Sequence, residues 1–185
     1  MYENVFGDMR ILKSLIFILL MTISTQSFSD IIEQETFASR WLRTKNYTIE
    51  VAKAMPEDKY AYRPVEKVMS FDEELKHMME NFGKLSNFMG ENEGQEILDQ
   101  LVDWESKDKT EKLKIVADCF DKVGAKWTKY SEDELNAIVP FFKKEIKMTR
   151  QGIFELMNDH IAHHRGRLTL MLSMNEIQSP NYVGW

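Results

Sequence analysis

The stretch that decides the fold lies near the C-terminus, where the chain reads Asn158-Asp159-His160-Ile161-Ala162-His163-His164-Arg165-Gly166-Arg167. The chain has only four histidines, and three of them fall in this stretch. His160 and His164 are spaced i,i+4, so on a helix both imidazoles project from the same face, one turn apart. Two imidazoles at this spacing can reach one divalent metal ion. A third histidine from a neighbouring helix would complete a three-ligand site with open positions, and the remaining histidine is His77.

The rest of the chain is predicted to be helical. Its 185 residues suit one domain, and Gly and Pro are few. Apolar residues recur at helical spacing in four segments, which predict helices at about residues 31–55, 70–90, 108–126 and 149–175. The sequence therefore predicts an all-α fold.

Local signals mark where some of these elements begin and end. Ser70 with Glu73 matches a capping box, and so does Ser131 three residues before Glu134. The second box opens a short helix that Pro140 is expected to end. Residues 91–107 are polar and predict a loop, in which residues 97–102 are compatible with a helical turn.

The predicted helices differ in which positions they bury. The second helix has an apolar stripe of Phe71, Leu75, Met78, Phe82, Leu85 and Met89. The third buries Leu113, Val116, Phe120 and Val123. The fourth places Ile153, Met157, His160, His164 and Met171 on one face. His77 lies roughly 110° from the centre of the second stripe, on its flank. A histidine pair on an apolar face is also compatible with core histidines that hydrogen-bond to their neighbours.

The N-terminus is predicted to be a secretory signal peptide, residues 1–29. Arg10 and Lys13 precede an apolar run over residues 15–21, and small and polar residues follow through Ser29. The apolar run is well below the roughly 20 residues that span a bilayer, so no stable membrane span is expected after processing. An uncleaved anchor is the alternative, and Met9 is an alternative start. The expected mature domain is residues 30–185, exported to the periplasm or secreted from a bacterium.

The net charge and the cysteine content argue against some classes of function. A formal net charge of −6 argues against nucleic-acid binding, which needs a clustered basic surface. The single cysteine, Cys119, cannot form an intramolecular disulfide and is expected to be a buried apolar residue. A catalytic thiol is the alternative for Cys119, although helical spacing places no activating partner beside it.

Several motifs together resemble the DinB-like family of metal-binding four-helix bundles. They are His77 soon after the start of the second helix, the His-x-x-His-His-Arg-Gly run from His160, the Met55–Tyr60 link followed by Arg63-Pro64, and the tail Ser179–Gly184. The resemblance covers nearly the whole of residues 30–185. It implies a four-helix bundle whose metal ligands are His77, His160 and His164. His163 is then expected to support the ligands or the fold.

The resemblance also implies what such a site does. The family includes metal-dependent hydrolase-like proteins and thiol S-transferases, and some members form homodimers, which this chain permits. Zinc, nickel or iron would suit three imidazoles. A water bound to the metal would have its pKa lowered and could attack a small-molecule substrate. One departure is Arg167, where the family usually has Gln; its cation is expected to reach the rim, or else to meet an anionic substrate.

Three functions remain open at this stage. The first is a metal-dependent hydrolase, with thiol S-transfer as a variant that export makes less suitable, because the thiols concerned are cytoplasmic. The second is a non-enzymatic module that binds a metal or a small ligand, because no general base can be assigned among Asn158, Asp159 and Glu73. The third is a structural protein with core histidines. Catalytic residues are therefore unknown.

Overall fold

The computed structural model describes residues 37–90 and 93–182. The chain divides into two compact units, Met1–Ser39 and Arg40–Trp185. In the first unit the described residues 37–39 are helical. The predicted signal peptide, the alternative start at Met9 and residues 31–36 of the first predicted helix lie outside the described residues.

The second unit is mostly helical, as predicted. Its first helix continues through residue 54. The later elements are η1 (Glu57–Lys59), α2 (Phe71–Asn87), α3 (Glu93–Gln100), η2 (Trp104–Ser106), α4 (Lys109–Lys129), α5 (Glu132–Asn136), β1 (Ile138–Phe141), β2 (Lys143–Thr149) and α6 (Arg150–Met174). Among the described residues, no helix is both long enough and apolar enough to cross a membrane.

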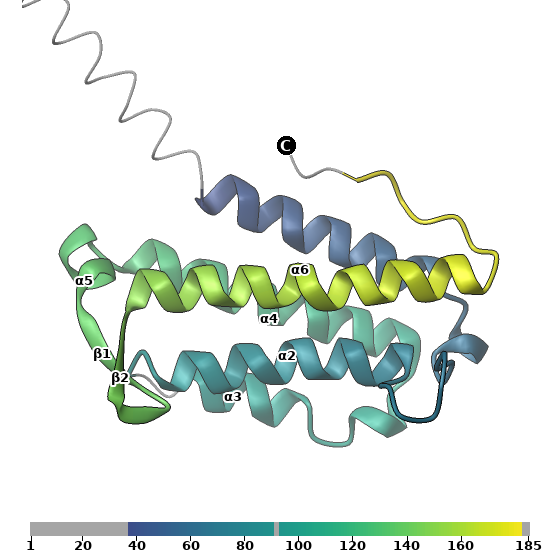
Figure 1. Ribbon diagram of the computed structural model, residues 1–185, viewed down its shortest axis with the longest axis horizontal. Coiled ribbons are helices and arrows are strands. Elements are labelled where there is room, and N and C mark those ends of the chain that lie inside the picture. The colour runs from purple at the N-terminus through teal and green to yellow at the C-terminus, as the bar shows by residue number, and fades with distance from the viewer. Residues whose placement is uncertain (1–36, 91–92, 183–185) are drawn as a thin grey trace, which may run out of the picture. The chain divides into compact units, whose positions relative to one another are not determined.

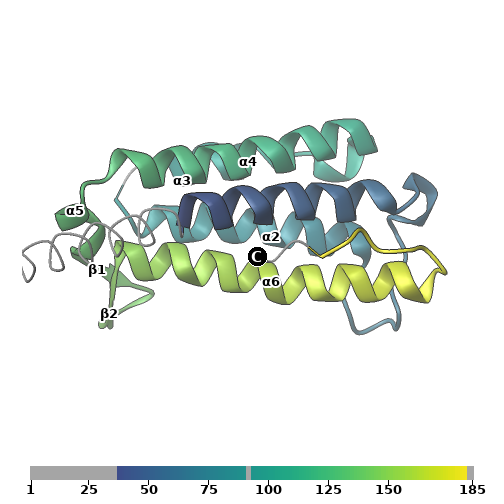
Figure 2. The same ribbon diagram turned by 90° about the horizontal axis from the view of Figure 1, so that it is seen from above.

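The first helix, α2, α4 and α6 are the long helices of the described residues, and they lie side by side (Figures 1 and 2). The first helix and α6 run in one direction, and α2 and α4 run in the other. The all-α prediction is thus confirmed, and α2 lies antiparallel to α6. This pairing positions the candidate site.

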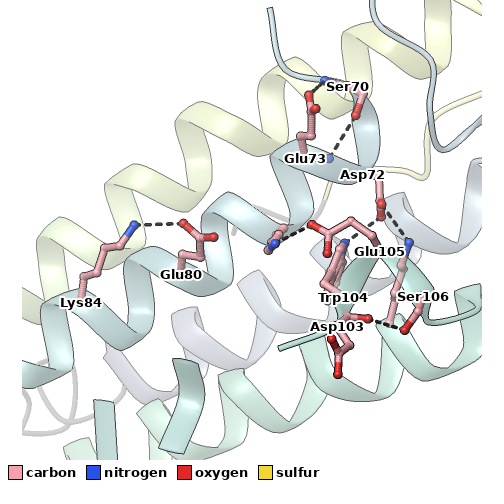
Figure 3. Close-up of polar contacts among 11 residues, drawn as sticks. Ser70, Asp72, Glu73, Glu80, Lys84, Asp103, Trp104, Glu105 and Ser106 are labelled. Carbon is pink, nitrogen blue, oxygen red and sulfur yellow. Dashed lines mark hydrogen bonds and ion pairs between the residues drawn. The ribbon is translucent and has the colours of Figure 1, made fainter. Parts of the chain in front are cut away.

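The helix starts follow from their capping residues. Ser70 accepts a hydrogen bond from the Glu73 amide, and the Glu73 carboxylate accepts one from the Ser70 amide, which is the reciprocal box that the sequence predicts (Figure 3). Ser131 and Glu134 form the same box at α5. Each box satisfies two amides that the first turn of a helix leaves without partners.

The predicted core is largely confirmed. All six apolar residues of the stripe predicted for the second helix are buried, the last of them, Met89, just beyond the end of α2, and so are Val116, Phe120 and Val123 of α4. Phe82 and Phe120 pack against Trp41 of the first helix, with ring centroids 5.2 and 5.1 Å from the indole. Leu113 is only half-buried, because the face of α4 toward the core is centred on its neighbours Lys112 and Val116.

The segment after α2 contains more helix than its polar sequence predicts. Residues 93–100 form α3, and Ile97 and Leu101 are buried. Trp104 follows, buried, and its indole donates a hydrogen bond to Asp72 at 3.0 Å (Figure 3). These few apolar side chains are sufficient to hold the segment against α2, which propensity alone does not reveal.

The prediction that Pro140 ends a helix is wrong. The short helix α5 ends at Asn136, and Pro140 lies inside β1, which pairs antiparallel with β2. Pro140 stands opposite Lys147, and the register shifts immediately afterwards. Proline is tolerated in an edge strand because its missing amide need not reach a partner. The hairpin packs on the end of α2, where Phe141 and Phe142 lie 5.0 and 4.9 Å from Phe88.

Candidate metal centre

The antiparallel pairing of α2 and α6 brings three histidines together. His77 comes from α2, and His160 and His164 come from successive turns of α6. Each offers one ring nitrogen, and these three atoms lie within 4.8 Å of one another. The structure thus groups the three histidines that the sequence singles out.

The rings form a compact triangle. The centroid of His77 is 5.0 Å from that of His160 and 4.6 Å from that of His164. His160 and His164 have centroids 4.3 Å apart, and their Nε2 atoms are separated by 3.1 Å. Two imidazole nitrogens on one tetrahedral zinc ion are about 3.3 Å apart, given zinc–nitrogen bonds of about 2.0–2.1 Å. The His160–His164 pair therefore has the separation of two ligands of one metal ion, and the three histidines together could hold such an ion.

The surroundings keep two of these imidazoles neutral. Burial lowers the pKa of His160 to about 4, and the neighbouring His164 and His77 act in the same direction. Burial likewise lowers the pKa of His164 to about 4, with His77 and His163 contributing. Only a neutral imidazole has a lone pair for a metal, so this environment keeps both residues ready as ligands at neutral pH.

Glu74 is a site residue that the sequence analysis missed. Its side chain is fully buried, and Oε2 lies 2.5 Å from Nδ1 of His164. Burial raises the pKa of Glu74, whereas Arg167 and His77 act against that shift. Its position three residues before His77 was the available signal, because this spacing places both side chains on one face of α2.

Arg167 also differs from its prediction. Instead of only reaching the rim, it turns to the buried carboxylate, with Nη2 2.9 Å from Oε1 of Glu74. Its side chain keeps 32% exposure, so one end of the ion pair meets solvent. Glu74 is therefore held between a histidine and an arginine of α6.

The three residues considered as general bases are placed less favourably. Glu73 belongs to the capping box and pairs with Arg63 at 2.8 Å, on the surface. Asp159 is exposed, and the Asn158 amide oxygen accepts a hydrogen bond from Thr44 at 3.1 Å. His163 is exposed as well, although its ring lies 4.9 Å from that of His164.

Cys119 is fully buried, as predicted. Burial raises the pKa of its thiol to about 12, with Asp118 acting in the same direction. A thiol must lose its proton to act as a nucleophile. Burial and the raised pKa of Cys119 therefore argue against the alternative of a catalytic thiol.

Comparisons with known proteins agree with this architecture. The sequence matches the DinB family over residues 22–174. It is 24% identical over 153 residues to the uncharacterized protein YjoA of Bacillus subtilis (strain 168), covering 81% of this chain and 96% of that protein.

Two solved structures share the fold. The crystal structure of the DinB-like protein YjoA from Bacillus subtilis aligns with a TM-score of 0.61 at 22% identity, covering 78% of this chain and 94% of that one. A DinB-like protein from Bacillus cereus ATCC 10987 aligns with a TM-score of 0.60 at 18% identity, covering 80% and 97% of the two chains. The family match spans most of the sequence, the fold is shared, and the histidine cluster lies between the paired helices; the chain therefore belongs to the DinB family.

Proposed function

We propose that the protein binds one divalent metal ion through His77, His160 and His164 and uses it to hydrolyse a small-molecule substrate. The observation that carries the proposal is the meeting of three imidazole nitrogens within 4.8 Å of one another. Zinc, nickel and iron all suit such a donor set. When bound, the ion would supply Lewis-acid chemistry, because three neutral ligands leave its charge intact and leave coordination positions open.

In this proposal the residues around the metal site have different roles. The three histidines would hold the ion, and Glu74 would orient His164 from behind, as carboxylates commonly do for metal-bound histidines. The apolar residues of α2 and α6, such as Met78 and Met157, would exclude bulk water from one side.

A non-enzymatic metal-binding or ligand-binding module is the second candidate. It is favoured by the placement of the described carboxylates around the cluster. Glu74 is engaged by His164 and Arg167, and Glu73 by its capping box and Arg63. A hydrolase normally needs a group free to take a proton. Thiol S-transfer remains a variant of the enzyme proposal, and it suits an exported protein less well.

Metal content tests both candidates. The purified protein, its His160→Ala/His164→Ala variant and a His163→Ala control would be compared by elemental mass spectrometry. His163 is the matched control, because it is an exposed histidine on the same helix. Near-stoichiometric metal in the parent and the control, with none in the double variant, would support metal binding. No metal in any of them after reloading with zinc, nickel and iron would leave core histidines as the explanation.

Activity then separates the two candidates. Turnover of small esters, amides or lactones that disappears in the double variant and survives in the control would support the hydrolase. Stoichiometric metal without turnover across hydrolase and thiol-transfer panels would support the binding module.

We further propose that the protein is exported after removal of residues 1–29 and acts in the periplasm or outside the cell. This proposal rests on the order of charged, apolar and small residues at the N-terminus. The partner would be a small molecule, not nucleic acid, and a homodimer is compatible with the chain. N-terminal sequencing of protein recovered from the periplasm or the medium would test the cleavage position.

A further inference from the structure

We propose that Glu74 and Arg167 form an ion pair that presets His164 as a metal ligand. In this arrangement Glu74 fixes the tautomer of His164 through its contact with Nδ1, and Arg167 pairs with the other oxygen of Glu74 and balances the charge of the carboxylate. The inference rests on the proposed metal binding, but its first consequence concerns the metal-free protein.

The burial of Glu74 calls for a functional explanation. Its side chain has no exposed surface, and it lies on α2 among apolar core residues such as Leu75 and Met78. A carboxylate in such a place is costly unless it is paired and hydrogen-bonded. Oε2 contacts Nδ1 of His164, and Oε1 is ion-paired with Arg167 but accepts no hydrogen bond from the described residues. The cost is therefore offset in part by groups of the metal site itself.

The contact with His164 determines which ring nitrogen carries the proton. Oε2 of Glu74 lies 2.5 Å from Nδ1 of His164. The other oxygen of this carboxylate is ion-paired with Arg167, and a carboxylate so paired accepts hydrogen bonds, which assigns the proton to Nδ1 of His164. The lone pair of neutral His164 then lies on Nε2, the atom that stands 3.1 Å from Nε2 of His160. His164 thus presents its free nitrogen toward the other two histidines before any metal arrives.

Arg167 holds Glu74 in this position through an ion pair. Nη2 approaches the other oxygen of Glu74 at 2.9 Å, and guanidinium stays charged at all ordinary pH values. The charges of Glu74 and Arg167 cancel, so a metal beside His164 would keep its own charge undiminished. Glutamine at position 167 could hydrogen-bond to the carboxylate but could not balance its charge.

His160 gives an internal contrast. Its Nδ1 is buried and has no hydrogen-bond partner among the described residues. His160 is therefore held by packing and by its contact with His164, whereas His164 is held by a charged partner. The two ligands on α6 should differ in how strongly their orientation is preset.

The test combines two measurements on the full chain. The tautomer of His164 in the metal-free protein is read by long-range proton–nitrogen NMR, and zinc affinity is measured by competition with a chromophoric chelator. The variants are Glu74→Gln and Arg167→Gln. Their matched controls are Glu80→Gln, from an exposed pair with Lys84 on the same helix (Figure 3), and Arg63→Gln, from the exposed pair with Glu73.

We expect the Nδ1–H tautomer for His164 in the parent protein. Zinc affinity should fall by roughly 10–100-fold in Glu74→Gln, the usual effect of removing the residue behind a metal-bound histidine. It should fall by a smaller factor in Arg167→Gln. Both controls should stay within about twofold of the parent, because exposed pairs contribute little.

Two results would overturn the inference: an Nε2–H tautomer in the parent, or parental zinc affinity in both Glu74→Gln and Arg167→Gln. If Glu74→Gln does not fold, the inference is still tested by the zinc affinity of Arg167→Gln and by the tautomer of His164 in the parent protein. A parent that takes up no zinc would end the proposed function instead, while the tautomer would still report whether Glu74 presets His164.

Discussion

Nε2 of His160 lies 3.1 Å from Nε2 of His164, one helical turn further along α6. Two ring nitrogens this close must share a proton or a metal ion, because two lone pairs facing each other repel. If His164 carries its proton on Nδ1, as proposed above, Nε2 of His160 is the donor in this contact, and a metal bound by both atoms would take the place of that proton.

Zinc should stabilise the protein through the histidine cluster. A ligand that binds only the folded state adds about 2.7 kcal/mol at a concentration 100 times its Kd. For a domain of this size that corresponds to a rise in Tm of about 5–10 °C. Differential scanning fluorimetry with and without zinc would measure it. The rise should vanish in His160→Ala/His164→Ala and persist in His163→Ala; an equal rise in all three proteins would place the zinc elsewhere.

Acidification should destabilise the metal-free protein between about pH 6.5 and pH 4. The folded protein lowers the pKa values of His160 and His164 to about 4 from 6.5. Between these pH values the two histidines bind protons in the unfolded chain but stay neutral in the folded chain, so the free energy of unfolding falls as the pH falls. Above pH 6.5 the stabilisation is fully present.

Urea denaturation at several pH values in the presence of a chelator would show this slope. The double variant His160→Ala/His164→Ala supplies the comparison, because the ordinary carboxylates titrate in both proteins. A parental slope no steeper than that of the double variant would contradict the assigned pKa values.

Cys119 should be inert in the folded protein. It is fully buried and its pKa is raised to about 12, so at pH 8 almost none of it is thiolate. Ellman's reagent should react with it at least about 100-fold more slowly in buffer than in denaturant. Because the chain has one cysteine, the signal is unambiguous. Fast labelling of the native protein would show that α4 opens readily.

Two glycine-to-alanine substitutions should change stability in opposite directions. A Cβ on Gly83 would lie 2.6 Å from Leu98 Cγ and 2.9 Å from the Gly94 carbonyl oxygen, where α3 approaches α2 closely. Gly83→Ala should therefore cost about 1–3 kcal/mol despite better helix propensity. A Cβ on Gly166 would meet nothing within 4 Å, so Gly166→Ala should stabilise α6 by about 0.5–1 kcal/mol. Chemical denaturation of the two variants would measure both; a destabilised Gly166→Ala would mean that this part of α6 needs glycine for another reason.

The parts of the fold that follow from local rules were predictable. The capping boxes at Ser70 and Ser131 and the apolar stripe of α2 lie where the sequence predicts them, since helix spacing and caps are properties of neighbouring residues. The hairpin was not predictable in this way. Acidic residues and Pro140 suggested a helix and its end, whereas pairing of β1 with β2 depends on residues up to 11 positions apart, as Ile138 opposite Thr149 shows.

The candidate site also contains some residues that local sequence signals predict and others that only distant contacts reveal. The spacing of His160 and His164 is local, and it was sufficient to group them. Glu74 is different, because its contact with His164 joins residues 90 positions apart. A glutamate in the first turn of a helix is ordinarily explained by the helix dipole. Only the packing of α2 against α6 shows that this one points inward.

The division of the site between two helices makes its integrity depend on helical phase. On α6, His160, His164 and Arg167 face Glu74 and His77 because they follow one another by four and three residues. One inserted or deleted residue inside this run would rotate everything beyond it by about 100° around the helix axis. Arg167 would then point away from Glu74 while α6 stayed helical. Length changes at the hairpin turn near Phe142 lie outside the run and would leave the phase intact. Natural variation in length should therefore be tolerated at the hairpin and excluded from residues 160–167.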